Sequence, residues 1–125
     1  MRKRRQLKEN VELSLHFLSV GNFKKLLKDY KGALSLYDKA LELNPDYAEA
    51  YYKRGNLKVL LEDFNGAQDD FNKAINLKPD YAEALNNRGI IKLRFGDEKG
   101  SKTDFYNAAR HGCFKAFEVR KEFCR

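Results

Sequence analysis

The chain has little of what marks several common classes of protein. It contains only 2 cysteines and 2 prolines in 125 residues, and no tryptophan. Two cysteines are too few for the disulfide framework of a small secreted domain. No apolar run approaches the roughly 20 residues that a membrane-spanning helix needs, and charged residues follow the basic start, Met1 to Arg5, where a secretory signal would be apolar. These absences predict a cytoplasmic protein, and the scarcity of proline and glycine favours helices.

The two cysteines are predicted to be free thiols. Cys113 and Cys124 would stand roughly 16 Å apart on a continuous helix, which rises about 1.5 Å per residue. A disulfide tolerates Cα separations of up to about 7 Å, so the pair is too far apart to be bridged.

One motif recurs at a spacing of 34 residues. The segment from Asn44 to Asn56 reads NPDYAEAYYKRGN, and the segment from Lys78 to Ile90 reads KPDYAEALNNRGI. Three units of this length are predicted, at residues 14–47, 48–81 and 82–115. A basic, partly helical extension over 1–13 precedes them, and the apolar spacing predicts a helix that begins near Leu7 to Asn10 and ends near Leu27.

Four columns of residues set the register of the units. They are Gly21, Gly55 and Gly89; Ala33, Ala67 and Ser101; the aromatic residues Tyr37, Phe71 and Phe105; and Ala40, Ala74 and Ala108. Small residues let two backbones approach closely and an aromatic ring fills the space beside them, so each unit is predicted to be a pair of antiparallel helices.

Helix boundaries are marked by aspartate and proline. Asp29, Asp63 and Asp97 stand where the second helix of each unit should begin, and they are predicted N-caps. Pro45 and Pro79 are predicted to end one helix and to begin the next, because proline lacks the donor that a helix interior needs but fits a first turn.

This pattern resembles the tetratricopeptide repeat, a 34-residue helix-turn-helix unit. The resemblance covers about residues 14–115 and implies an all-α, right-handed solenoid of three hairpins. The segment 116–125 resembles the capping helix that closes such arrays. The third unit has Ser101 for the packing alanine and Cys113 for the closing proline, which predicts an irregular end to that unit.

In that family the first helices of successive units line a concave groove, and the resemblance implies the same here. The predicted peptide-binding residues are Leu18, Asn22, Tyr52, Lys53, Asn56, Asn86, Asn87 and Ile90. Other residues predicted to face the groove are Ser19, Lys25, Leu26, Glu49, Val59, Leu60, Glu83, Leu93 and Arg94. Amides mixed with aliphatic side chains suit an extended peptide, so the predicted function is a non-catalytic protein-protein interaction scaffold.

Some family members hold the acidic tails of heat-shock chaperones in a clamp of asparagine and basic residues. Asn22 matches the first asparagine of that clamp. The other positions carry Leu18, Lys53, Glu83 and Asn87 where Lys, Asn, Lys and Arg are expected. Because an ionised carboxylate needs charge-assisted donors, the sequence disfavours a chaperone-tail partner.

Two alternatives remain open. The amphipathic first helix has no obvious cover near Leu13 to Phe17, which favours self-association into a homo-oligomer. The net charge of +7 lies mainly at the two ends of the chain, so the basic termini could bind nucleic acid or an anionic membrane surface. Glu49 and Glu83 interrupt the continuous basic stripe that nucleic acid would require.

A second set of charged residues recurs inside the repeats. Arg54, Lys58 and Asp70 return as Arg88, Lys92 and Asp104, whereas the first unit has Val20, Lys24 and Leu36. Because the arginine and the aspartate are replaced together, the pattern predicts an ion pair between the two helices of a unit.

The sequence predicts no enzyme, no metal site and no cofactor. His16 and His111 lie in different units, and His111 with Cys113 lacks the third group that catalysis or zinc would need.

Overall fold

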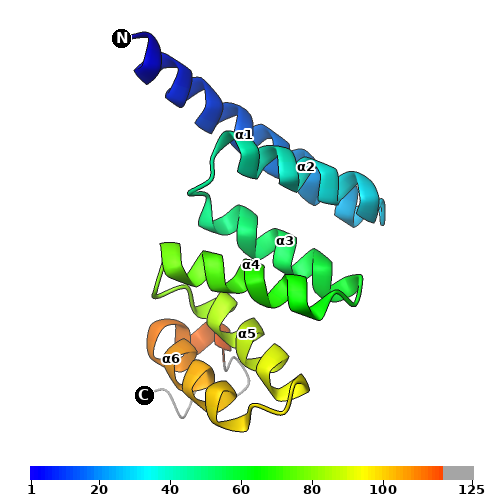
Figure 1. Cartoon of the computed structure of the whole chain (residues 1–125), viewed down its shortest axis with the longest axis vertical. Coiled ribbons are helices and arrows are strands. Elements are labelled where there is room, and N and C mark those ends of the chain that lie inside the picture. The colour runs from blue at the N-terminus through cyan, green and yellow to red at the C-terminus, as the bar shows by residue number, and fades with distance from the viewer. Residues whose placement is uncertain (117–125) are drawn as a thin grey trace.

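The computed structural model describes residues 1–116, and the side chains of residues 1–112. This part of the chain forms six helices and no strands: α1 Arg2–Leu26, α2 Tyr30–Leu43, α3 Ala48–Leu60, α4 Phe64–Leu77, α5 Ala82–Arg94 and α6 Glu98–Ala116. The helices pack as three hairpins stacked in chain order (Figure 1). The all-α solenoid is therefore confirmed, while the predicted capping helix lies, apart from Ala116, outside the described residues.

Each hairpin turns in the same way. After the first helix one residue adopts a left-handed backbone: Lys28 (φ 64°), Glu62 (φ 62°) and Gly96 (φ 82°). The next amide then bonds back to the last turn, as in Asp29 N–H to Lys24 C=O at 2.9 Å and Asp63 N–H to Lys58 C=O at 2.8 Å. This is the Schellman arrangement, which satisfies carbonyls that the end of a helix leaves unpaired.

The same aspartates then cap the second helix. The Oδ1 atoms of Asp29 and Asp63 accept hydrogen bonds from the amides of Gly32 and Gly66 at 3.0 Å, and Asp97 does so from Gly100 at 2.9 Å. The predicted N-caps are confirmed. A Cβ atom on any of these three glycines would collide with the capping carboxylate, which explains why the glycines recur with the aspartates.

The two prolines lie in the connections between hairpins rather than in helices. Residues 44–47 and 78–81 form turns in which Tyr47 N–H donates to Asn44 C=O at 3.2 Å and Tyr81 N–H to Lys78 C=O at 3.0 Å. Proline is favoured at the second position of such a turn because its φ is already set. Pro45 and Pro79 thus follow the end of a helix as predicted, but the prediction that they begin the next helix is wrong, since α3 and α5 begin at Ala48 and Ala82.

The core runs between the paired helices. Tyr37 and Phe71 are fully buried, and their rings lie against Gly21 and Gly55, where any Cβ atom would come within 2.7 Å of the ring. Ala33, Ala67, Ala40 and Ala74 are also fully buried. The small columns therefore do what the sequence indicates: they bring the helices close enough for one aromatic ring to fill the space between them.

The first helix begins earlier than predicted, at Arg2 instead of near Leu7 to Asn10. Residues 2–9 are all exposed and contain one apolar residue, Leu7, so no apolar stripe marks the start of this helix in the sequence. They are nevertheless good helix formers, mainly Arg, Lys, Gln, Leu and Glu, with no proline or glycine to stop the helix. Figure 1 shows the N-terminal part of α1 extending beyond the end of α2.

The last described helix is interrupted at Gly112, whose backbone is not helical (φ −157°, ψ 51°). This agrees with the irregular end predicted for the third unit. The predicted free thiols cannot be placed, because Cys124 and the side chain of Cys113 lie outside the described residues. In the described part of the chain, no helix combines the length and apolar character that crossing a membrane would require.

Candidate functional site

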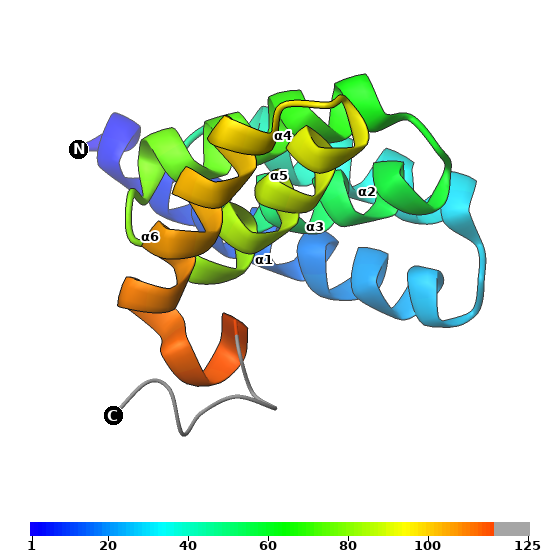
Figure 2. The same ribbon diagram turned by 90° about the horizontal axis from the view of Figure 1, so that it is seen from below.

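Two hollows lie between neighbouring first helices of the hairpins, one between α1 and α3 and one between α3 and α5. The lysine pocket, between α1 and α3, has a volume of about 440 Å³. It is lined by Asn22, Lys25, Leu26, Lys28, Tyr30, Lys53 and Leu60. The asparagine pocket, between α3 and α5, has a volume of about 160 Å³ and is lined by Asn56, Val59, Asn87, Ile90 and Ile91. Five of the eight predicted binding residues line these two pockets. Figure 2, seen from below, looks along the stack of hairpins.

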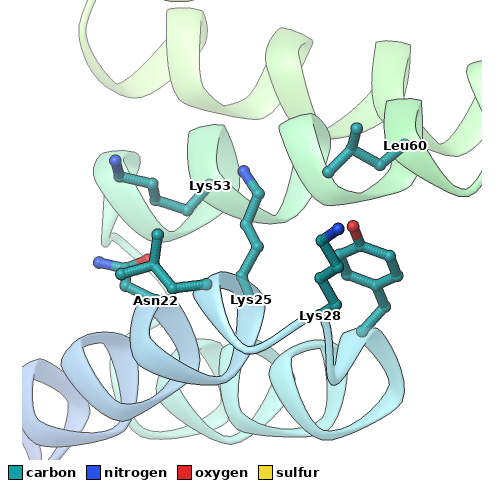
Figure 3. Close-up of a pocket in the computed structure, with 7 residues that line it drawn as sticks. Asn22, Lys25, Lys28, Lys53 and Leu60 are labelled. Atoms are coloured by element: carbon teal, nitrogen blue, oxygen red, sulfur yellow. The ribbon is translucent and has the colours of Figure 1, made fainter.

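The lysine pocket is cationic. The side chain of Lys25 rises from α1 between those of Lys28 and Lys53, as Figure 3 shows. Burial and the neighbouring charge of Lys53 lower the pKa of Lys25. Leu26 and Leu60, both well exposed, and the half-buried Tyr30 add an apolar side to the pocket.

The asparagine pocket is neutral. The Nδ2 group of Asn87 donates a hydrogen bond to Oδ1 of Asn56 at 2.7 Å, which joins α5 to α3. Ile90 is 53% exposed at the edge, whereas Ile91 is buried beneath. Once paired, the two amides still have donor and acceptor capacity for a backbone that lies across them.

Two predicted binding residues are also held by the fold. The Tyr37 hydroxyl donates a hydrogen bond to Oδ1 of Asn22 at 2.7 Å, so this amide anchors α2 to α1 as well as lining the lysine pocket. The half-buried ring of Tyr52 lies 5.1 Å from that of Tyr81 and 6.2 Å from that of Phe71, measured between centroids. Tyr52 therefore packs at the junction of two units and lines neither pocket.

One predicted surface position is wrong. Leu18 is 2% exposed and packs in the core with Tyr37 and Leu57, so it offers no surface to a ligand. It follows Ser14 by four residues and precedes Gly21 by three, on the buried side of α1. Asn86 is half-buried on α5 and lines neither pocket.

The predicted ion pairs are confirmed in both units. Arg54 donates two hydrogen bonds to Asp70, at 2.7 and 2.9 Å, and Lys58 lies 3.1 Å from the same carboxylate. Arg88 and Lys92 hold Asp104 in the same way, at 2.7 to 3.0 Å. The hydrogen bonds to Asp70 raise the pKa of Arg54. These carboxylates are almost completely buried, so the charges are structural.

Each arginine makes a second contact, which was not predicted from the sequence. Nη1 of Arg54 reaches back to Asp38 of the preceding unit at 2.9 Å, and Nη1 of Arg88 reaches Asn72 at 3.1 Å. Asp38 and Asn72 stand 34 residues apart, and this spacing is the signal that could have revealed them. Each arginine thus joins its own hairpin to the one before.

Among the residues whose side chains are described, no group of three or more His, Cys, Asp or Glu residues could hold a metal ion.

Known proteins similar to this chain share its repeats. The family model described as TPR repeat matches residues 21–62 and 55–96, which together span more than half of the chain. No curated protein sequence matches it.

Three solved structures have a similar fold. The Arabidopsis OM64 TPR domain is 26% identical, with a TM-score of 0.81, covering 93% of this chain and 97% of that one. The first TPR of Spaghetti (RPAP3), bound to the HSP90 peptide SRMEEVD, is 24% identical, with a TM-score of 0.80 and coverage of 89% and 90%. MamA is 23% identical with a TM-score of 0.76, and the match covers 82% of this chain but only 60% of MamA.

Proposed function

Because the chain belongs to the tetratricopeptide repeat family, we propose that it is a non-catalytic protein-interaction scaffold that binds a peptide segment of a partner protein along α1, α3 and α5. The observation that carries this proposal is the pair of pockets in successive positions between these helices. Each combines amide or ammonium groups with exposed aliphatic side chains, which suits a peptide bound through its backbone and through alternate side chains.

Selection from a random linear peptide library tests the proposal. Peptides selected on the wild-type protein should bind it in a fluorescence anisotropy titration, and the triple variant Asn56→Ala/Asn87→Ala/Ile90→Ala should bind them at least tenfold more weakly. Asn56 and Asn87 are hydrogen-bonded to each other, so removing both leaves no amide without its partner, and the variant should still fold.

The matched control carries three substitutions on the second helices, Lys73→Ala, Lys102→Ala and Asn107→Ala. Thermal unfolding of both variants verifies that they fold. Equal binding of the selected peptides by the pocket variant, or a loss shared with the control, would contradict a binding site in the groove.

We do not propose the acidic tail of a chaperone as the ligand. The RPAP3 structure holds an HSP90 peptide, but in this chain Leu18 is buried and Glu83 stands where a clamp lysine is expected. The peptide SRMEEVD should accordingly bind wild-type protein no better than a scrambled peptide of the same composition.

Self-association is a second candidate function, and exposed apolar residues on α1 favour it. Leu7, Val11 and Leu15 follow one another at spacings of four, and they are 64%, 50% and 56% exposed. A second copy of α1 could cover this stripe. Sedimentation across a concentration series should then show a dimer that Leu7→Gln/Val11→Gln/Leu15→Gln converts to a monomer, whereas a wild-type monomer at all concentrations would exclude it.

A further inference from the structure

Six lysines of α1, the turn after it, α3 and α5 form two sets. Lys24, Lys58 and Lys92 each have an acidic partner, namely Asp29, Asp70 and Asp104. Lys25, Lys28 and Lys53 take part in no ion pair of the described residues, and no acidic residue lines the pocket that they share. Asp29, which follows Lys28, is occupied as the cap of α2. Three positive charges therefore surround one hollow without compensation.

The fold does not require these charges, and the chain itself provides the comparison. Each position of the lysine pocket can be compared with the position 34 residues later, in the asparagine pocket. Asn22 corresponds to Asn56, but Lys25 corresponds to Val59 and Lys53 to Asn87. Lys28 is replaced by Glu62, in the same left-handed conformation. The same backbone thus builds a neutral pocket in one place and a cationic pocket in the other.

The cationic pocket is costly for the free protein. Desolvation and the charge of Lys53 lower the pKa of Lys25, which means that its charged form is disfavoured where it stands. A bound anion would offset both effects, because its charge would counter the repulsion and its oxygens would accept hydrogen bonds from the ammonium groups in place of water.

The number of lysines indicates the charge of the anion. A carboxylate carries one negative charge, whereas a phosphorylated side chain carries about −1.5 to −2 at pH 7 and offers three acceptor oxygens. The volume of about 440 Å³ has room for a phosphorylated side chain together with an apolar neighbour against Leu26, Leu60 and Tyr30. Asn22 adds an amide donor at the same site.

We propose that the lysine pocket is the position in the groove where a phosphorylated side chain of the peptide partner binds. This inference rests on the proposed peptide-binding function and names the chemistry of its ligand. Specificity comes from the pocket between α1 and α3, while the asparagine pocket holds an unmodified part of the same peptide.

Three degenerate peptide mixtures, with phosphoserine, serine or glutamate fixed at the central position, test the inference by fluorescence anisotropy. The wild-type protein should bind the phosphoserine mixture at least tenfold more tightly than the other two. The variant Lys25→Val/Lys53→Asn should lose that preference, and it should fold because the same residue types already stand at 59 and 87. The control Lys73→Val/Lys102→Asn changes the charge equally on exposed sites of α4 and α6 and should keep the preference.

The outcomes separate the two proposals. Equal binding of the phosphoserine and serine mixtures would overturn the phosphate inference while leaving a peptide groove in place. Failure of all three mixtures to bind would overturn both. Glutamate binding as tight as phosphoserine would assign the pocket to carboxylates, and displacement by single-stranded RNA that depends on Lys25 and Lys53 would assign it to nucleic acid; either result contradicts the inference.

A second measurement uses inorganic phosphate and needs no peptide. In a titration at constant ionic strength, with chloride as the reference, amide resonances at residues 22, 25, 28 and 53 should shift in the wild type and stay in place in Lys25→Val/Lys53→Asn. Shifts that are equally large in both proteins would overturn the assignment of the site. Should the double variant fail to fold, Lys53→Asn alone serves, with a smaller loss expected.

Discussion

Two carboxylates, Asp70 and Asp104, are only 3% and 1% exposed, and each is held by an arginine and a lysine. Burying a charge is unfavourable unless partners compensate it, and such an arrangement fixes geometry more than it adds stability. In the first unit the equivalent residues are Val20 and Leu36. Charge and apolar contact are therefore alternative solutions at one position of the repeat.

Asp70→Asn should lower the free energy of unfolding by about 2–4 kcal/mol, because it leaves Arg54 and Lys58 without their common counter-ion. Urea denaturation measures this loss. Asp38→Asn is the control: it weakens a half-exposed pair and recreates the contact that Arg88 already makes with Asn72, so its cost should stay below about 1 kcal/mol. Equal losses in the two variants would refute the structural role of the buried carboxylate.

The left-handed residue after each first helix gives a second prediction. Glu62 has φ of 62° in a position where Gly96 has φ of 82°. A side chain disfavours this conformation and glycine does not, so Glu62→Gly should raise the free energy of unfolding by about 0.5–1 kcal/mol. Gly96→Ala should lower it by a similar amount. Unchanged melting temperatures in both variants would contradict the assigned backbone conformation.

Tyrosine ionisation should make the protein less stable in alkali. Burial raises the pKa of the Tyr37 phenol to about 12, compared with about 10 in an unfolded chain. Its contribution to stability is complete below about pH 10 and is lost as the pH rises through about 12. Burial also raises the pKa of Tyr81 and Tyr47, which adds to the loss.

Comparing the denaturation of wild type and Tyr37→Phe over this pH range isolates the effect of Tyr37. The lowered pKa of Lys25 affects stability with the opposite sign, but it does so in both proteins and therefore cancels in the comparison. The difference in stability between the two proteins should shrink as the pH rises from about 10 to about 12. A difference that does not vary with pH would exclude Tyr37 as its source.

At the scale of helices, the close approach within each hairpin depends on glycine. A Cβ atom at Gly55 would lie 2.7 Å from Cε1 of Phe71. Alanine normally stabilises a helix interior by about 0.5–1 kcal/mol relative to glycine. Gly55→Ala should instead destabilise the protein by about 1–3 kcal/mol, as overpacking does.

A double-mutant cycle with Phe71→Leu tests this explanation by chemical denaturation. In the Phe71→Leu background, Gly55→Ala should cost less than in the wild type, because the ring that it would meet is gone. Strictly additive losses would mean that the contact between the glycine and the ring is not the cause.

The N-terminal and C-terminal parts of α1 should differ in stability. Residues 2–9 are exposed and extend beyond α2, whereas Ser14, Leu18 and Gly21 are buried. Helical stability in proteins comes mainly from packing, so amides at residues 6–9 should exchange with solvent at least a hundredfold faster than those at 18–21. Hydrogen exchange at low protein concentration measures this ratio. Equal protection of the two segments would contradict an uncovered N-terminal part of α1.

For the whole molecule, the sequence predicts the repeated parts well. The columns of glycine, small and aromatic residues and the aspartate caps recur in all three units, and the Arg54–Asp70 pair recurs in two of them, so the 34-residue spacing reveals them. Two of the misplaced features occur only once. The start of α1 has no apolar stripe to mark it, and Leu18 could not be assigned to the core because the path of α1 past α2 decides which of its sides is covered.

The candidate site shows the same division. Lys53, Asn56, Asn87 and Ile90 could be placed near the groove from the family pattern, and they line the pockets. Two other features of the site depend on side-chain directions and on the turn after α1. They are the hydrogen bond between Tyr37 and Asn22 and the position of Lys28 beside Lys25 in the lysine pocket. Neither follows from spacing alone.

Each arginine contacts the preceding hairpin, so a second copy of the middle hairpin would fit against the first. A duplicate of residues 48–81 inserted after residue 81 would place its own Arg54 against Asn72, the partner that Arg88 uses, and would offer Arg88 a new Asn72 in turn. The connecting turns would match as well, since both contain proline followed by aspartate and tyrosine. The molecule can therefore be lengthened by whole hairpins that keep the backward arginine contact at both junctions, so the middle hairpin can serve as a module for engineering longer arrays.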